Sequence, residues 1–221
     1  MLIAGRLVDV DELPDGFQDP SWSNPALQRD RLVEFLASDH AFYNDYLVKN
    51  HFAATAERKV MLLSPWCKVI MTFRDIRDSV VSRYYHHLRA GEVPEHGTFE
   101  EFFWAPEPPN GRQTLDYLSH YVTTWNIDDD SLWKIRYEDL HADTESAVRS
   151  LADFLEVDTE LVDIDEVVRL SLPAVRKRET GTTHIRTGRP GDWYNHLGER
   201  ELELIDQIVP QTVRSLVLDG D

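Results

Sequence analysis

Residues 68–91 read KVIMTFRDIRDSVVSRYYHHLRAG, and this stretch predicts a buried strand followed at once by a helix. The run from 68 to 74 is short, continuous and rich in strand-forming residues, which is typical of a strand buried on both faces. Asp75 can cap the helix that follows, and Asp78 adds an acidic side chain to its first turn. Gly91 is placed to end this helix. Apolar side chains repeat every four residues along it, at Val80, Tyr84 and Leu88.

The alternation of strand and helix continues on both sides of this stretch. Upstream, the sequence predicts an irregular loop at 11–25, a helix at 26–39, a short strand at 46–48 and a short helix at 53–63. Downstream, it predicts a helix at 114–125, a turn at 126–130, a strand at 131–137 and a long helix at 138–157. A loop at 171–197 and a last helix from 199, interrupted by Pro210, follow. This order predicts one α/β domain over residues 1–221, with a mostly parallel sheet flanked by helices. Ligands of such sheets bind at the carboxyl ends of the strands.

Composition argues against several classes of protein. The 221 residues carry 40 acidic and 23 basic side chains, a net charge of −17, which disfavours a general nucleic-acid binder. The bases are 18 Arg and 5 Lys, and 23 of the acids are Asp, which suits either a high-salt environment or an ordinary acidic soluble protein. The single cysteine, Cys67, allows no internal disulfide and suits a reducing compartment. No run of eighteen apolar residues predicts a membrane span, and the first residues do not resemble a signal peptide, so we expect a cytoplasmic protein.

Arg74 is a candidate anion-binding residue because it stands between the predicted strand and helix. Free backbone N–H groups, the helix dipole and a guanidinium would converge at that junction. The alternative is an ordinary strand-to-helix junction with arginines on its surface.

A second candidate segment, at 186–193, reads RTGRPGDW. Glycines between arginines let a backbone wrap closely around an anion. Residues 171–190 hold one acid, Glu179, against five basic residues, namely Arg176, Lys177, Arg178, Arg186 and Arg189. The segment therefore binds either an anionic ligand or the acidic surface of the protein itself.

A third candidate, His51, follows the predicted strand at 46–48 and lies two residues after Lys49. A histidine beside a cation can act as a general base next to a charge that neutralises an anion. A single histidine can equally be a structural residue.

Taken together, these segments resemble the sulfotransferases that use 3′-phosphoadenosine-5′-phosphosulfate (PAPS). VIMTFRDIRDSVVSRYYHH is similar to the family's 3′-phosphate-binding strand and helix, and LWKIRYEDL to its strand ending in Tyr-Glu-Asp. RTGRPGDWYNHL is similar to its closing loop, the most specific of the matches, and LVKNHF falls where the family has Lys-Thr-His. The four matches occur in the family's order over residues 47–197. The resemblance implies the P-loop-NTPase-like α/β fold of that family.

The resemblance also implies a set of cofactor-binding residues. Arg74 and Ser82 would hold the 3′-phosphate of PAPS, and Tyr137 would lie near the adenine. The closing loop would cover the same phosphate through Arg186, Thr187 and Gly188.

Two further residues would carry the chemistry. His51 would deprotonate a hydroxyl or amine acceptor, and Lys49 would help to neutralise the sulfuryl group during transfer. The acceptor would be a small molecule or a glycan rather than a nucleic acid, and the reaction requires no metal.

One family motif has no match here. The family's first strand leads into a phosphosulfate loop like Pro-Lys-Ser-Gly-Thr-Thr-Trp, and by family spacing that loop would lie just upstream of Met1. The Gly-Thr-Thr at 181–183 has no strand before it. We therefore expect residues 1–221 to lack the first strand and the loop, either as a fragment, through a misassigned start or as a shortened protein.

Other functions remain open at this point. One alternative is a shortened relative that only binds 3′-phosphoadenosine nucleotides or a partner, whereas a kinase-like phosphotransferase is disfavoured because no G-x-x-x-x-G-K-[ST] loop exists. The sequence does not distinguish a monomer from a homo-oligomer. Five aromatic residues either line an acceptor pocket or belong to the core, namely Phe42, Tyr43, Phe52, Trp66 and Trp104.

Overall fold

A computed structural model describes residues 2–3, 6–7, 31, 34–35, 37–38, 53–55, 59, 67–93, 97–172, 175 and 188–218. The predicted loop at 11–25 and strand at 46–48 lie outside these residues, as do most of the predicted helices at 26–39 and 53–63. Near the N-terminus, β1 (Leu2–Ile3) pairs with β2 (Arg6–Leu7) in an antiparallel arrangement.

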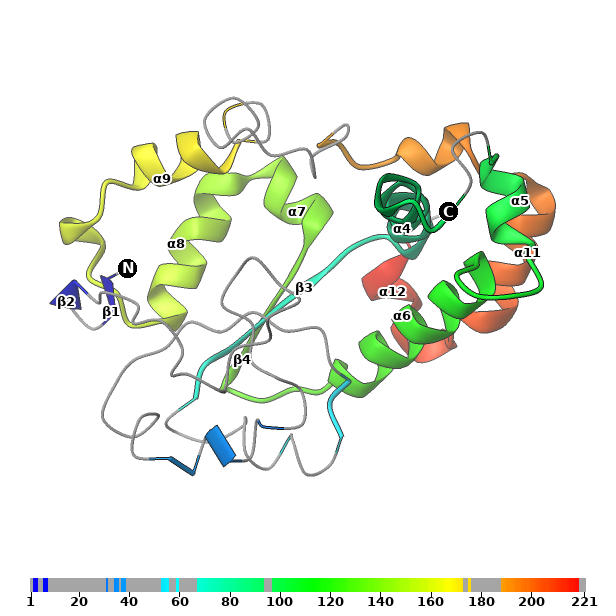
Figure 1. Cartoon of the computed structure of the whole chain (residues 1–221). Coiled ribbons are helices and arrows are strands. Elements are labelled where there is room, and N and C mark those ends of the chain that lie inside the picture. The colour runs from blue at the N-terminus through cyan, green and yellow to red at the C-terminus, as the bar shows by residue number, and fades with distance from the viewer. Residues whose placement is uncertain are drawn as a thin grey trace.

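A parallel pair of strands organises the described part of the chain (Figure 1). β3 (Val69–Phe73) and β4 (Leu132–Arg136) run side by side in a register that pairs Val69 with Leu132 and Phe73 with Arg136. The strands predicted at 68–74 and 131–137 are therefore confirmed, except that Tyr137 lies outside β4 and begins the next helix. Both strands end at the same edge of the sheet, where loops and helix N-termini gather.

The helix after β3 is α4 (Ile76–Ala90), and it begins and ends as predicted. The Asp75 side chain caps it by accepting a hydrogen bond from the Arg77 backbone N–H. Gly91 ends it in the left-handed conformation, at φ 73°, with its N–H directed to the last carbonyls of the helix. Apolar side chains, including the fully buried Val80 and Val81, anchor α4 in the core.

The long helix predicted at 138–157 is wrong, because the chain forms two helices there. α7 (Tyr137–Ala142) ends at Asp143, and α8 (Thr144–Phe154) begins immediately after it. The Asp143 carboxylate accepts a hydrogen bond from the Ser146 backbone N–H at 3.0 Å, so it caps α8 instead of continuing α7. An aspartate competes with the helical backbone in this way and favours helix ends over interiors.

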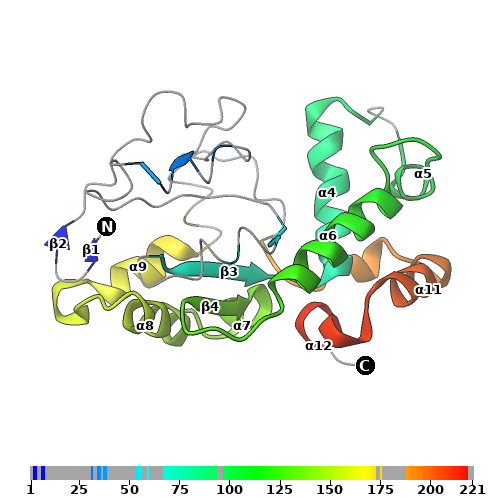
Figure 2. The same cartoon turned by 90° about the horizontal axis from the view of Figure 1, so that it is seen from below.

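The other helices form two groups around the strands (Figure 2). On one side, α8 packs with α7 and with α9 (Ile164–Ser171), and the short helix η2 (Thr159–Leu161) lies between α8 and α9 in the chain. Beyond the carboxyl end of β3, α4 packs with α5 (Phe99–Phe103), α6 (Gly111–Trp125) and η3 (Asp192–Asn195). The helix predicted at 114–125 is confirmed and begins three residues earlier, at Gly111, because Asn110 caps it.

The last helices complete this second group. α11 (Glu199–Ile208) begins where the sequence predicted it and stops before Pro210, and η4 (Gln211–Val213) and α12 (Arg214–Val217) follow. Among the described residues no helix is both long and apolar enough to cross a membrane. The main core lies between α4, α5, α6 and α11, and its most deeply buried side chains include Ile76, Phe103, Leu115, Ile205 and Val213.

Candidate functional site

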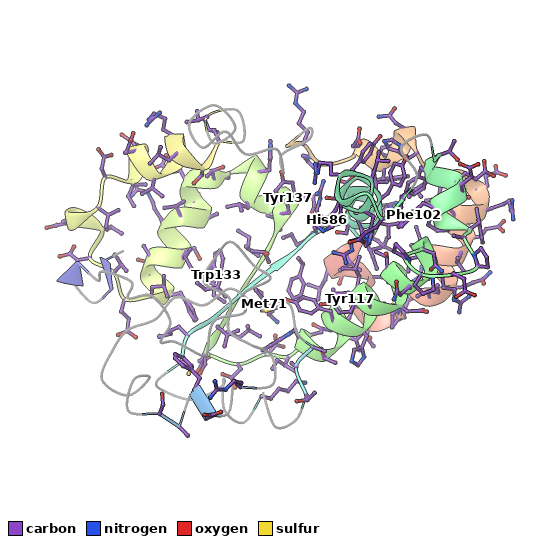
Figure 3. The ribbon with its side chains drawn as sticks, viewed as in Figure 1. Met71, His86, Phe102, Tyr117, Trp133 and Tyr137 are labelled. Atoms are coloured by element: carbon purple, nitrogen blue, oxygen red, sulfur yellow. The ribbon has the colours of Figure 1, made fainter. Side chains whose placement is uncertain are left out.

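The carboxyl ends of β3 and β4 bring together two residues singled out from the sequence. Arg74 directly follows β3, Tyr137 directly follows β4, and the guanidinium carbon of Arg74 lies 4.9 Å from the centre of the Tyr137 ring. Figure 3 shows Tyr137 at this end of the strands, beside the start of α4. A guanidinium over an aromatic face is held by the cation–π attraction.

Arg74 is also held by a carboxylate. Its Nη2 lies 3.4 Å from Oδ2 of Asp78, while its Nε is buried without a hydrogen-bond partner among the described residues. A buried donor that lacks a partner is costly, so a native site usually has a use for it. The guanidinium is therefore fixed in place, and its buried Nε has no hydrogen-bond partner among the described residues.

Ser82 lies on the exposed part of α4, one turn beyond Asp78, where its hydroxyl is accessible. His86 lies one further turn along the same helix, and burial together with the charge of Arg83 lowers its pKa. His86 is therefore neutral at pH 7 and adds no positive charge to this face of α4.

The loop at 188–193 closes over the start of α4 through Asp78. The Asp78 carboxylate accepts hydrogen bonds from the backbone N–H groups of Gly191 and Trp193, at 2.7 and 3.0 Å. Gly188 and Gly191 both adopt positive φ, 66° and 84°, which directs the backbone around this turn. From the sequence, Asp78 was expected only to add charge to the first helical turn, so its contact with the loop was missed.

Two other contacts attach the same loop. The Arg77 guanidinium stacks at 3.9 Å on the Trp193 ring and pairs with the Asp75 carboxylate through both its Nε and Nη2. At the other end of the loop, the Gly188 carbonyl lies 2.9 Å from Nε2 of His141 on α7. The loop thus spans from the helix after β4 to the helix after β3.

Charges at this edge are paired within the protein. The Asp75 backbone N–H donates to Oε1 of Glu138 at 3.0 Å, and the other oxygen of Glu138 lies 3.6 Å from Nη2 of Arg136. Tyr137 is half-buried, and this burial raises its pKa, with the nearby Arg74 acting in the opposite direction. The Tyr137 hydroxyl therefore stays protonated at neutral pH and can donate a hydrogen bond.

Several predicted site residues cannot be placed. His51, Lys49, Arg186 and Thr187 lie outside the described residues, as do four of the five aromatic candidates. The fifth, Trp104, hydrogen-bonds Glu201 and lies under Arg200, so its polar contacts are with α11 rather than with Arg74 or Tyr137. In the described part of the chain, no cluster of three or more His, Cys, Asp or Glu side chains is arranged to hold a metal ion.

The arrangement matches a known class of proteins. A family model described as "Sulfotransferase domain" matches residues 43–216, which is most of the chain, so the chain belongs to the sulfotransferase family. This confirms the resemblance inferred from the sequence motifs.

Several curated relatives are sulfotransferases of animals. Sulfotransferase 6B1 of Pan troglodytes is 26% identical over 149 residues, covering 63% of this chain and 48% of that protein. Sulfotransferase 2A6 of Rattus norvegicus is 28% identical over 164 residues, covering 66% and 57%. Sulfotransferase 2B1 of Mus musculus is 27% identical over 219 residues, covering 89% and 63%. The chain thus spans about half to two thirds of the length of these relatives.

Solved structures agree on the fold. A mouse sulfotransferase, SULT7A1, complexed with PAP, superposes with a TM-score of 0.64 at 16% identity, over 92% of this chain and 77% of that chain. A retinol dehydratase in complex with androsterone and the inactive cofactor PAP gives a TM-score of 0.55 at 18% identity, over 80% and 56%. The predicted α/β sulfotransferase fold is therefore confirmed.

Proposed function

We propose that this protein transfers the sulfuryl group of PAPS to a hydroxyl or amine of a small-molecule or glycan acceptor. The observation that carries the proposal is the Arg74 guanidinium, which is fixed by Tyr137 and Asp78 at the carboxyl end of the strands and keeps a buried donor unpaired among the described residues. Membership of the sulfotransferase family supports the reaction class, and the neighbours with PAP in their titles support the nucleotide.

The described residues fit the 3′-phosphate half of such a nucleotide. Arg74 supplies positive charge and an Nε donor that has no partner among the described residues, and Ser82 presents an accessible hydroxyl on α4. Gly188 begins a loop that lies across the same strand ends, and Tyr137 offers an aromatic face nearby. We assign Arg186 and Thr187 to the same loop on the strength of the family resemblance.

In the proposed reaction PAPS supplies an activated sulfuryl group and leaves as 3′,5′-ADP. His51 accepts the proton of the acceptor as the new oxygen–sulfur or nitrogen–sulfur bond forms and the bond to the 5′-phosphate breaks. Lys49 neutralises charge on the sulfuryl oxygens. A cation that is already in position before the reaction lowers the barrier to sulfuryl transfer most.

Nucleotide binding tests this proposal. We expect the chain to bind 3′,5′-ADP more tightly than 5′-AMP, because only the former carries the 3′-phosphate that Arg74 would hold. Arg74→Ala should weaken 3′,5′-ADP binding about 10- to 150-fold, the equivalent of one hydrogen bond to a charged group, and leave 5′-AMP binding nearly unchanged. Isothermal titration calorimetry measures both affinities.

Arg149→Ala is the matched control, since Arg149 is an exposed arginine that pairs with Glu145 on α8. It should leave both affinities as they are. Equal affinity of the unsubstituted chain for the two nucleotides would contradict the proposed 3′-phosphate site.

A further inference from the structure

We propose that Asp78 is a positioning residue that assembles the 3′-phosphate site, because it fixes the loop at 188–193 against the arginine that binds the phosphate. This inference rests on the proposed function. Asp78 is 1% exposed and uses both carboxylate oxygens: Oδ1 accepts from the Trp193 N–H, while Oδ2 accepts from the Gly191 N–H and lies 3.4 Å from Nη2 of Arg74.

A carboxylate is the group that this position requires. Three donors converge on it from two separate segments, and a carboxylate has enough lone pairs to accept all of them. Its place in the first turn of α4 stabilises its charge through the helix dipole. An amide of the same shape would offer one oxygen only, and its NH₂ group would face a backbone N–H or a guanidinium.

Two other attachments of the loop, among the described residues, are made to partners other than Arg74. His141 contacts the Gly188 carbonyl from α7, and Arg77 stacks on the Trp193 ring while its guanidinium pairs with Asp75. Among the described residues, the Asp78 carboxylate is therefore the group that contacts both Arg74 and the backbone of the loop.

Two roles for Asp78 predict opposite effects. If Asp78 served only as a counter-charge for Arg74, it would compete with an incoming phosphate, and neutralising it would strengthen phosphate binding. If Asp78 holds the loop in place, neutralising it releases the loop, and the loop no longer covers the 3′-phosphate. The sign of the change in affinity thus separates the two roles.

Asp78→Asn tests the inference with two measurements. Amide hydrogen exchange of Gly191 and Trp193 should become about tenfold faster or more, as expected when a charge-assisted hydrogen bond is lost. The ratio of 3′,5′-ADP to 5′-AMP affinity should fall by about tenfold, measured by calorimetry. Unchanged exchange, or an unchanged or higher ratio, would overturn the assignment.

Asp163→Asn is the control for the chemical change, because Asp163 also accepts a backbone N–H, at 2.9 Å, but at the start of α9. It should leave both measurements unaltered. If the unsubstituted chain does not distinguish the two nucleotides, the proposed function fails together with this inference. If it does and Asp78→Asn keeps the ratio, only the Asp78 assignment fails.

A second variant reaches the same contact from the loop and leaves the charge in place. Gly191→Ala adds a methyl group at φ 84° with no atom within 4 Å of it, so it strains the backbone without a clash. The nucleotide ratio should again fall. Gly91→Ala carries the same strain at φ 73°, also in open space, at the far end of α4, and should not change the ratio.

Discussion

Arg74, which we propose to hold the 3′-phosphate, is ordered by two neighbouring side chains. Tyr137 lies under the guanidinium and Asp78 lies beside it, so few side-chain conformations are open to it before any ligand arrives. Such ordering in advance lowers the entropic cost of binding. A lysine here would offer a point charge without the planar donors that a phosphate can engage in pairs.

The role that we propose for His51 as general base predicts that its replacement lowers the rate of transfer and leaves nucleotide binding intact. We expect His51→Ala to lower kcat by about 10²- to 10⁴-fold, the usual contribution of a general base, while the affinity for 3′,5′-ADP changes little. Transfer of labelled sulfuryl groups from PAPS to a panel of phenols, sugars and amines measures kcat, and calorimetry measures the affinity. His120→Ala, an exposed histidine on α6, is the control. Full activity of the His51→Ala protein would show that the Lys-Asn-His match is accidental.

The sequence predicts residues of the site only where their neighbours in the chain carry the signal. Arg74 was found because a buried strand and a capped helix flank it within a few residues. Asp78 was placed in the first turn of α4, but its partners Gly191 and Trp193 are 113 and 115 residues away, and no local pattern marks such a contact. Its place in the first turn of a helix that directly follows a buried strand is the one hint that the sequence offers.

At the scale of elements, strands and helix starts were the most predictable features. β3 and β4 formed at the runs predicted as strands, 68–74 and 131–137, and Asp75 and Gly91 bound α4 as the sequence indicated. The break between α7 and α8 was missed because an aspartate such as Asp143 is tolerated inside a helix and also caps one. Whether Asp143 continues one helix or caps the next depends on how α7 and α8 pack on β4. The local sequence does not contain that information.

The contact between α5 and α6 depends on a glycine. A Cβ added to Gly111 would lie 2.5 Å from the Phe103 ring and 2.9 Å from its Cα, closer than real Cβ atoms approach. We expect Gly111→Ala to lower the free energy of unfolding by about 1–3 kcal/mol, the usual cost of overpacking a core, although alanine favours helices. Urea denaturation measures it.

Gln113→Ala is the control for that substitution, because it adds the same residue at an exposed position two residues further along α6. It should change the stability by less than about 0.5 kcal/mol. Equal stability of Gly111→Ala and the unsubstituted chain would mean that α5 can move away from α6 at no cost.

At the scale of the whole molecule, the negative charge and the proposed ligand conflict. The chain carries a net charge of −17, yet we propose that it binds a nucleotide with several negative charges. The described ion pairs include several exposed pairs within single helices, such as Arg149 with Glu145 and Arg169 with Glu166, and pairs of this kind stabilise a protein little. Repulsion among the acids therefore remains a destabilising contribution.

Salt should consequently act in opposite directions on stability and on binding. Raising sodium chloride from about 0.05 to 1 M shortens the screening length to about 3 Å and weakens repulsion among the exposed acids, so the free energy of unfolding should rise. The same screening weakens the attraction between the Arg74 site and the phosphates, so the affinity for 3′,5′-ADP should fall. Urea denaturation and calorimetry across one salt series measure both quantities, and potassium chloride should act alike because screening depends on ionic strength. A stability that falls as salt is added would contradict the repulsion argument, since it would mean that attractive ion pairs outweigh the excess of 17 acids over bases.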